Sequence, residues 1–296
     1  MPHFEEHRSL LTGVAYRILG SVADAEDVVQ EAWLRWSRVD EAEVEDPRAY
    51  LVRVTSRLAI DRLRWAKSRR ESYVGPWLPE PIGTEPDVAE HAELAESVEL
   101  ALLLVLETLS PLERAVFVLR EAFDLPFAEI AEIIGRTEPA TRQLARRARD
   151  HVRERRPRFD VDGEERRRIT ERFITASAEG DLDGLIELFA SGVTMVSDGG
   201  GKARAALRAI TGARNVGRWL MSINTPANLA AFMASIGLAD VSGLSFGVAT
   251  LNNAPAMVVS VEGRVITVIS LLIVDGEIDT IYLIANPDKV AHLKPA

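Results

Sequence analysis

Apolar residues recur at helical spacing through the first half of the chain and gather into short runs near its end. The apolar residues of 127–134 lie on one face of a predicted short helix, which a turn at Gly135 ends. Beyond this turn, Leu144, Ala148 and Val152 recur every four residues and predict the buried stripe of a second helix. Two helices joined in this way indicate a helix-turn-helix.

Helix start signals predict two further helices near the beginning of the chain. Ser21 is a plausible N-cap, with Asp24 at the capping-box position and more acids in the first turn. Asp46 is a second plausible N-cap, because Pro47 suits the first helical position and neither glycine nor proline follows before Arg70. The first helix has an acidic face and the second a basic one.

The pattern changes after Val161. Two helices are expected there, with a break at Gly180-Asp181, followed by a strand over 193–198 and a further helical stretch. Apolar strands then follow over 242–251, 254–263, 265–276 and 277–289, and turn residues separate them at Asn252-Asn253, Glu262-Gly263 and Asp275-Gly276. This order predicts an α+β domain with a curved antiparallel sheet.

Composition limits the classes of protein to consider. The chain has 296 residues, 47% of them hydrophobic, which is enough for two or more domains with their own cores. It has no cysteine, which excludes disulfides and thiolate zinc sites and suits a reducing compartment. No secretion signal is evident in Met1–Leu10 and no apolar run is long enough to span a bilayer, so a cytoplasmic location is expected.

The net charge of −10 hides segregated charges. Residues 48–70 and 138–158 are rich in arginine, whereas residues 71–99 hold only acids among their Asp, Glu, Lys and Arg residues. Four prolines, the last at Pro86, predict that the acidic stretch is an extended linker at least that far. Two basic modules therefore flank an acidic segment.

Arginine on a helix can bond guanine edges or neutralise phosphates in the major groove. Arg142, Arg146, Arg149 and Arg153 lie opposite the apolar stripe of the second helix in the helix-turn-helix, which favours DNA binding over a merely solvated face. On the helix after Pro47 the basic face alone leaves both readings open. Its Trp65 is either a stacking group for bases or a core residue.

The order of three segments resembles regions 2 and 4 of extracytoplasmic-function sigma factors. They read SLLTGVAYRILGSVADAEDVVQEAWLRWSR, DPRAYLVRVTSRLAIDRLR and LSPLERAVFVLREAFDLPFAEIAEIIGRTEPATRQLARRAR, and the likeness covers about residues 1–158. The resemblance implies two all-α sigma domains, a region 2 helical bundle and a region 4 helix-turn-helix. It also implies two partners, which are core RNA polymerase (β′ clamp helices and β flap) and promoter DNA (−35 and −10 elements).

The resemblance assigns roles by position. The −35 set is Pro139, Thr141, Arg142, Gln143, Arg146 and Arg147. The −10 set is Arg53, Arg57, Asp61, Arg62, Arg64 and Trp65. The polymerase-binding set is Asp24, Glu26, Asp27, Gln30, Glu31 and Trp33.

The last part of the chain resembles the SnoaL-like branch of the cone-shaped NTF2-like fold. Three short motifs, WLPEPI, DGGGK and NPDK, are similar to those of sigma factors in which a fused SnoaL-like domain regulates activity, with no separate anti-sigma factor required. The expected regulatory contact comprises Trp77, Leu78, Pro79, Asp198, Gly199, Gly200, Gly201, Lys202, Asn286, Pro287, Asp288 and Lys289. Taken alone, DGGGK would suit a flexible turn or, less readily because it lacks the Walker A spacing, a phosphate-cradling loop. NPDK alone would suit a chain-end turn, and WLPEPI an extended linker that buries a tryptophan.

The expected organisation is region 2 over 1–70, an acidic linker over 71–95, region 4 over 96–160 and a SnoaL-like regulatory domain over 161–296. The predicted function is promoter-specific transcription initiation, modulated in cis, without catalysis, cofactor or metal. The alternatives are a ligand-responsive DNA-binding regulator and a fused SnoaL-like cyclase or isomerase with Asp198 as its base. No histidine lies between Val161 and Ala291, which disfavours the enzyme. The sequence leaves open whether this domain binds a small-molecule ligand.

Overall fold

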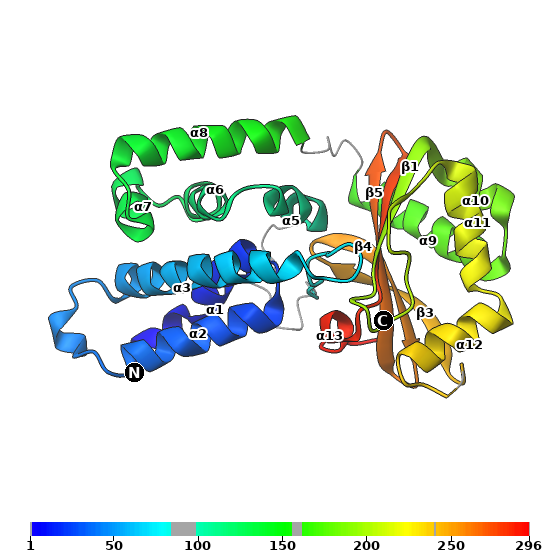
Figure 1. Ribbon diagram of the computed structural model, residues 1–296, viewed down its shortest axis with the longest axis horizontal. Coiled ribbons are helices and arrows are strands. Elements are labelled where there is room, and N and C mark those ends of the chain that lie inside the picture. Colours follow the sequence, from blue (N-terminus) through cyan, green and yellow to red (C-terminus); the bar gives the residue numbers. More distant parts are fainter. Residues whose placement is uncertain (1, 84–98, 156–161, 240, 296) are drawn as a thin grey trace. The chain divides into compact units, whose positions relative to one another are not determined.

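The computed structural model describes the chain except residues 1, 84–98, 156–161, 240 and 296 (Figure 1). It divides into two compact units. The first comprises Met1–Glu71 with Pro86–Arg156, and the second comprises Ser72–Glu85 with Pro157–Ala296. The segment that follows the helix ending at Arg70 thus belongs to the C-terminal unit, although the predicted linker around Pro86 and beyond lies outside the described residues.

The first unit begins with a helical bundle of α1 (Pro2–Leu19), α2 (Val22–Trp36), the short η1 (Glu41–Glu43) and α3 (Pro47–Arg70). The expected caps are present, since the side chain of Ser21 accepts from the amide of Asp24 and that of Asp46 from the amide of Ala49. Leu11, Tyr16, Trp36, Leu51 and Leu63 are fully or almost fully buried and form its core.

The second part of this unit contains α5 (Leu100–Glu107), α6 (Pro111–Phe117), η2 (Val118–Ala122), α7 (Phe127–Ile134) and α8 (Glu138–Arg155). Gly135 ends α7 in the left-handed conformation (φ 64°), and the Thr137 hydroxyl accepts from the amide of Ala140 at the start of α8. The helix-turn-helix is confirmed. Its buried stripe is slightly rotated from the prediction, because Thr141, Ala145, Ala148 and Val152 are buried while Leu144 is half-buried.

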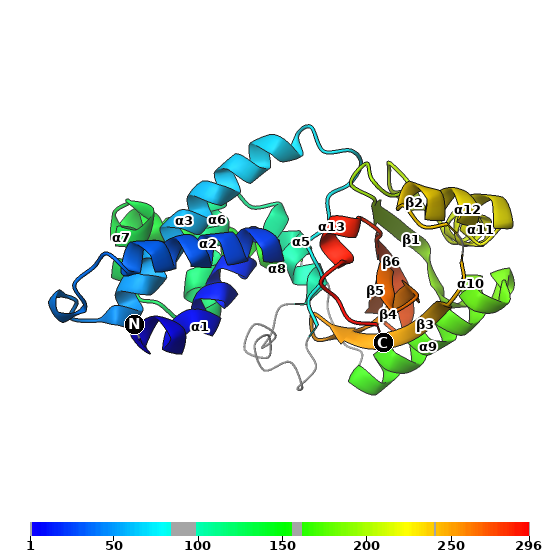
Figure 2. The same cartoon turned by 90° about the horizontal axis from the view of Figure 1, so that it is seen from below.

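The C-terminal unit combines a six-stranded sheet with helices on both of its sides (Figure 2). The helices are α9 (Gly163–Glu179), α10 (Leu182–Leu188), α11 (Ala213–Ile223), α12 (Pro226–Ser235) and α13 (Pro287–Val290). The strands are β1 (Phe189–Asp198), β2 (Ile210–Thr211), β3 (Leu244–Leu251), β4 (Ala254–Val261), β5 (Arg264–Val274) and β6 (Glu277–Ile284), in the sheet order β2-β1-β6-β5-β4-β3.

The predicted turns do join β3 to β4, β4 to β5 and β5 to β6 in antiparallel pairs. The sheet is nevertheless mixed, because β1 pairs in parallel with β6. β1 lies far from β6 in the sequence, and a parallel neighbour is available to strands joined by a long crossover. The alternation of apolar and polar residues in β1 could not alone reveal its pairing with β6.

Helices α9 to α12 cover one face of the sheet, and α13 with the segment 72–83 lies on the other side (Figure 2). Phe173 on α9, Leu185 on α10 and Val216 on α11 share a core with Met195 and Ile281 of the strands, and all five are fully buried. The cone-shaped α+β fold expected for this part is present. None of the helices in the described ranges is long and apolar enough to cross a membrane.

Candidate DNA-binding helices and a buried linker cluster

The outer surface of α8 presents most of the predicted −35 set. Pro139, Arg142, Gln143, Arg146 and Arg147 are exposed. Thr141 is fully buried, and its hydroxyl donates to the carbonyl of Thr137, so this side chain is not at the surface of the helix. The structure thus gathers five of the six residues on one accessible face.

The arginines on this face differ in how strongly they are held. Arg142 donates to Glu138 and lies over the ring of Phe127, with its guanidinium carbon 4.7 Å from the ring centroid. Arg146 has a side chain that is 83% exposed, and its nearest acid, Asp150, is 3.8 Å away. Arg146 is therefore the more readily redirected of the two toward an external anion.

The predicted −10 set lies along α3. Trp65 is 50% exposed, and the guanidinium carbons of Arg62 and Arg69 lie 5.1 and 4.7 Å from its ring centroid. It is therefore a surface aromatic residue with cationic neighbours and not a core residue. Such a group can stack on an unpaired base.

The acidic face of α2 holds the predicted polymerase-binding set. Glu26, Asp27, Gln30, Glu31 and Trp33 are exposed, and Asp24 is half-buried. Arg62 of α3 bonds Asp24 and Asp27 at 2.7 and 3.0 Å. These hydrogen bonds, with that to Asp24 first, raise the pKa of Arg62. The structure therefore joins one residue of the −10 set to two of the polymerase-binding set.

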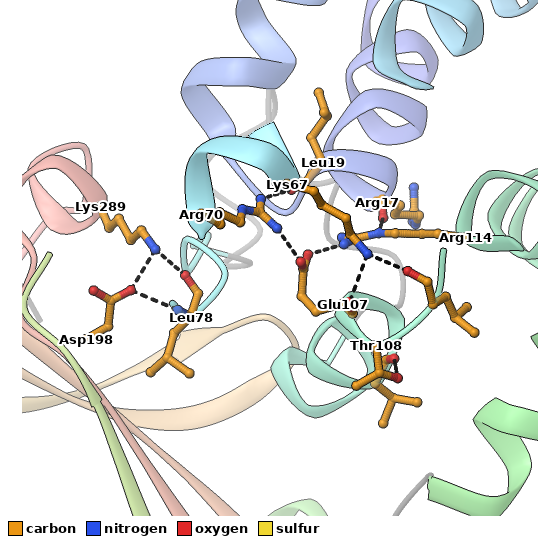
Figure 3. Close-up of polar contacts among 12 residues, drawn as sticks. Arg17, Leu19, Lys67, Arg70, Leu78, Glu107, Thr108, Arg114, Asp198 and Lys289 are labelled. Carbon is orange, nitrogen blue, oxygen red and sulfur yellow. Dashed lines mark hydrogen bonds and ion pairs between the residues drawn. The ribbon is translucent and has the colours of Figure 1, made fainter. Parts of the chain in front are cut away.

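The three short motifs meet around Asp198, which is completely buried at the end of β1 (Figure 3). Its Oδ2 accepts from the Nζ of Lys289 at 2.7 Å and from the amide of Leu78 at 2.8 Å. The same Nζ donates to the Leu78 carbonyl at 2.5 Å and lies 4.0 Å from the ring centroid of Trp77. Asp198 of DGGGK and Lys289 of NPDK thus form a buried ion pair, and both of them bond the backbone of Leu78 in WLPEPI.

Tyr73 is a further member of this group that motif analysis missed. Its hydroxyl donates to Oδ1 of Asp198 at 2.6 Å and accepts from Nδ2 of Asn286 at 2.9 Å. Burial, together with the bond to Asp198, raises the pKa of Tyr73 well above its usual range. Tyr73 lies outside WLPEPI, so only its place just before that motif could have indicated it.

The glycine run of DGGGK is required because other segments of the chain approach its backbone closely. Gly200 and Gly201 have φ of 60° and 72°, and a Cβ on Gly200 would lie 2.3 Å from the Asn286 side chain. A Cβ on Gly201 would lie 3.1 Å from that of Val74. The loop is therefore filled by the chain itself and is not an open phosphate cradle.

Further contacts, some of them from residues outside the three motifs, hold the segment 72–83 within the C-terminal unit. Lys202 pairs with Asp288 at 2.6 Å on the surface. The amide of Asn252 donates to the carbonyl of Ile82 at 2.9 Å, and a ring nitrogen of His292 lies 2.8 Å from the carbonyl of Pro81. We call the segment 72–83 with Asp198–Lys202 and Asn286–Lys289 the linker clamp.

Burial within the linker clamp is uneven. Trp77 is only half-buried, whereas Leu78 and Ile82 are 1% and 3% exposed. The two aliphatic side chains are thus almost completely buried. Trp77 instead covers the ammonium group of Lys289.

A separate cavity of about 310 Å³ lies between the sheet and the helices of the C-terminal unit. Its lining is mainly apolar, with Trp219, Phe232 and Met257 among the larger residues. Ser177 lines it with a buried hydroxyl that has no hydrogen-bond partner among the described residues. Asp198 is not part of this lining.

A helical bundle, a helix-turn-helix and an α+β cone on one chain define a sigma-type transcription factor with an added C-terminal α+β domain. The Sigma-70 region 2 family matches residues 3–69, and Sigma-70, region 4 matches residues 99–152. The ECF RNA polymerase sigma factor SigJ of Mycobacterium tuberculosis is 39% identical over 97% of this chain and 91% of its own. Its crystal structure covers 97% of this chain and 96% of its own, with a TM-score of 0.74 and 37% identity.

A second relative from M. tuberculosis, named probable ECF RNA polymerase sigma factor SigI, is 41% identical over 63% of this chain and 66% of its own. The chain belongs to the extracytoplasmic-function family of RNA polymerase sigma factors. Members of this class bind core RNA polymerase and direct transcription initiation at promoter DNA. The structure shows that this member carries an α+β domain C-terminal to region 4.

Proposed function

We propose that this sigma factor reads the −35 element with the exposed face of α8 and the −10 element with α3, and binds the polymerase β′ clamp with α2 and the β flap with its region 4. The exposed arginines of α8 and the surface position of Trp65 support the DNA assignments. The exposed acids of α2 support the clamp assignment. We retain the expected domain limits of 1–70, 71–95, 96–160 and 161–296, with the first part of the linker bound to the last domain.

We further propose that the C-terminal domain regulates initiation in cis through the linker clamp. The observation that carries this proposal is the buried pair of Asp198 and Lys289, both of which bond the backbone of Leu78. Residues 72–83 follow α3 directly and precede region 4 in the chain. Their attachment to the C-terminal domain therefore limits how far the two DNA-reading helices can separate.

Under this proposal, regulation needs no separate anti-sigma factor. It also gives Asp198 a structural role in place of catalysis, because its carboxylate is already bonded to Lys289, Tyr73 and Leu78. The cavity lining includes Arg204 but no Asp, Glu or His among the described residues. A site without an acid or base pair favours a regulatory domain over a cyclase or isomerase.

The test is run-off transcription with purified core polymerase and a cognate promoter. Trp77→Ala removes the aromatic cover of Lys289 and should change transcript yield several-fold, with faster hydrogen exchange over 72–83. Arg168→Met is the matched control, because it breaks an exposed ion pair on α9 of the same unit, outside the linker clamp. Parental yield together with unchanged exchange in Trp77→Ala would overturn regulation through the clamp.

The cavity supports a second role, which is binding of a small ligand by the C-terminal domain. Its volume lies at the lower end of the usual range for ligand sites. Its wall offers the Ser177 hydroxyl, which has no partner within the described part of the chain, and the exposed Arg204. An apolar molecule with one anionic end fits this chemistry. 8-Anilinonaphthalene-1-sulfonate should bind the parent and be displaced by decanoate, whereas Met257→Trp, which fills the cavity, should show little dye binding and no displacement. Equal displacement in both would exclude this site.

A further inference from the structure

A short loop after β1 belongs both to the linker clamp and to the wall of the cavity in the C-terminal unit. Its first part, residues 199–202, lies in the clamp, and its last three residues, Arg204, Ala205 and Ala206, line the cavity. We call residues 199–206 the shared loop. The clamp and the cavity are therefore connected by one short stretch of chain.

The end of β1 also connects the two faces of the sheet, because successive side chains of a strand point to opposite faces. The hydroxyl of Ser197 donates to the carbonyl of Ala206 in the cavity wall at 3.0 Å. The next residue, Asp198, bonds Leu78 of the segment 72–83, which lies on the other side of the sheet (Figure 2). A displacement of this strand end on one face therefore moves the bonded group on the other.

The shared loop is tightly folded, so its two ends cannot move independently. The amides of Lys202 and Ala203 donate to the carbonyl of Gly199 at 3.0 and 2.9 Å. A Cβ on Gly199 would lie 2.2 Å from the carbonyl oxygen of Ala203 and 2.9 Å from the side chain of Ala205. Close-packed groups transmit a displacement because there is no free volume to absorb it. Movement of the cavity end of the loop thus reaches the clamp.

A ligand with an anionic end can engage the shared loop directly. Among the described residues that line the cavity, Arg204 alone carries a charge, and its side chain is exposed. Its amide donates to the hydroxyl of Ser235, the last residue of α12, at 3.1 Å. A carboxylate bonded to the guanidinium of Arg204 would hold the loop in place, while an apolar chain filled the cavity.

We infer that a medium-chain carboxylate in the cavity tightens the linker clamp through the shared loop, so that ligand occupancy controls how firmly the segment 72–83 is held. The inference rests on the proposed ligand role of the cavity and on the proposed regulatory role of the clamp. A ligand shifts the opening of the clamp only by the ratio of its affinities for the closed and open forms. The same ratio must therefore appear when the clamp is altered and ligand affinity is measured.

Hydrogen exchange measured by mass spectrometry on the full chain tests this inference, with decanoate as the probe. Decanoate should slow exchange over 72–83 several-fold in the parent and have little effect in Met257→Trp, whose larger side chain fills the cavity. None of the described residues of α10 lines the cavity, so this helix provides the comparison. A ligand that only stabilised the whole unit would slow exchange in both segments alike, and that result would overturn the inference.

A second variant separates ligand binding from its transmission to the clamp. Ser197→Ala breaks the bond between the end of β1 and the carbonyl of Ala206, although Ser197 is not part of the cavity lining. This variant should still bind 8-anilinonaphthalene-1-sulfonate and release it to decanoate, but most of the slowing over 72–83 should be lost. Ser260→Ala is the matched control, because it removes a buried hydroxyl that contacts Ser245 between β4 and β3 and should keep the slowing.

The reverse measurement uses a residue of the clamp that does not line the cavity. Trp77→Ala should weaken decanoate binding by up to the factor by which decanoate slows exchange over 72–83. Decanoate that displaces the dye from the parent while exchange over 72–83 stays unchanged would overturn the coupling and leave the ligand site standing. Failure to displace the dye would overturn the ligand site, and the coupling with it. Parental transcription by Trp77→Ala would instead overturn regulation through the clamp.

Discussion

The ammonium nitrogen of Lys289 lies 2.7 Å from a carboxylate oxygen of Asp198, and neither side chain is more than 5% exposed. Breaking such a pair leaves one charge buried without its partner, which costs about 3–5 kcal/mol. We therefore expect Lys289→Met to lower the free energy of unfolding of the C-terminal unit by roughly this amount, as measured by urea denaturation.

The double variant Asp198→Asn/Lys289→Met removes both charges and should recover part of the loss. The surface pair of Lys202 and Asp288 provides the comparison, since Lys202→Met should cost at most about 1 kcal/mol. Equal costs for Lys289→Met and Lys202→Met would contradict a stabilising role for the buried pair. Truncation at Asn286 is a poorer test, because it also removes the buried Val290.

Local signals accounted for much of the fold. The caps at Ser21 and Asp46 and the left-handed Gly135 depend on nearest neighbours in the chain, so they were predictable from sequence. The turns between the last four strands were predictable for the same reason. The parallel pairing of β1 with β6 was not, because it depends on residues distant in sequence.

The candidate sites divide in the same way. Charge patterns indicated which faces of α2, α3 and α8 are polar, but they could not show that Arg57 bonds the carbonyls at the end of α7. Backbone carbonyls carry no sequence signature. Likewise DGGGK and NPDK each contain a lysine, and only the fold distinguishes the buried Lys289 from the exposed Lys202.

The linker clamp should give the protein a sensitivity to alkaline pH. Burial and the bond to Asp198 raise the pKa of Tyr73, so its phenol stays protonated in the folded state where an unfolded tyrosine ionises. The contribution of Tyr73 to stability is complete below pH of about 10 and is lost as pH rises through the folded-state value.

Urea denaturation at a series of alkaline pH values measures this effect. Tyr73→Phe should make stability fall less steeply above a pH of about 10. A difference absorbance titration of the parent against Tyr73→Phe isolates the ionisation of the Tyr73 phenol. Tyr282, whose pKa burial raises to about 12, provides the comparison through Tyr282→Phe. The prediction would be wrong if Tyr73 titrated like an exposed tyrosine.

The acidic face of α2 should contribute to polymerase binding. Asp27 is bonded to Arg62, so reversing its charge would also disturb the −10 set. Glu26 is exposed on the same helix and is the better position for the test. Glu26→Lys should weaken association with core polymerase in a competition assay, with its helical content unchanged by circular dichroism.

Glu164→Lys reverses an exposed acid in the first turn of α9 and should leave polymerase association unaltered. A well-folded Glu26→Lys protein that competed for core enzyme like the parent would exclude Glu26 from the interface. The two variants change the net charge equally, so a general electrostatic effect would weaken both.

The −35 helix offers a test of whether an arginine reads a base or holds a phosphate. Arg146 is 83% exposed and weakly paired, so it is free to reorient toward DNA. Arg146→Ala should cost about 1–3 kcal/mol in promoter affinity if the side chain bonds a base edge, with relaxed sequence preference. If it bonds a phosphate, the slope of promoter affinity against salt concentration should fall by about one charge, and the affinities for all DNA sequences should weaken together.

Arg168→Ala on α9, which removes another exposed arginine from an ion pair, is the matched control. Fluorescence anisotropy at several salt concentrations distinguishes these outcomes, and affinity and salt slope both equal to the parent's would remove Arg146 from the DNA interface.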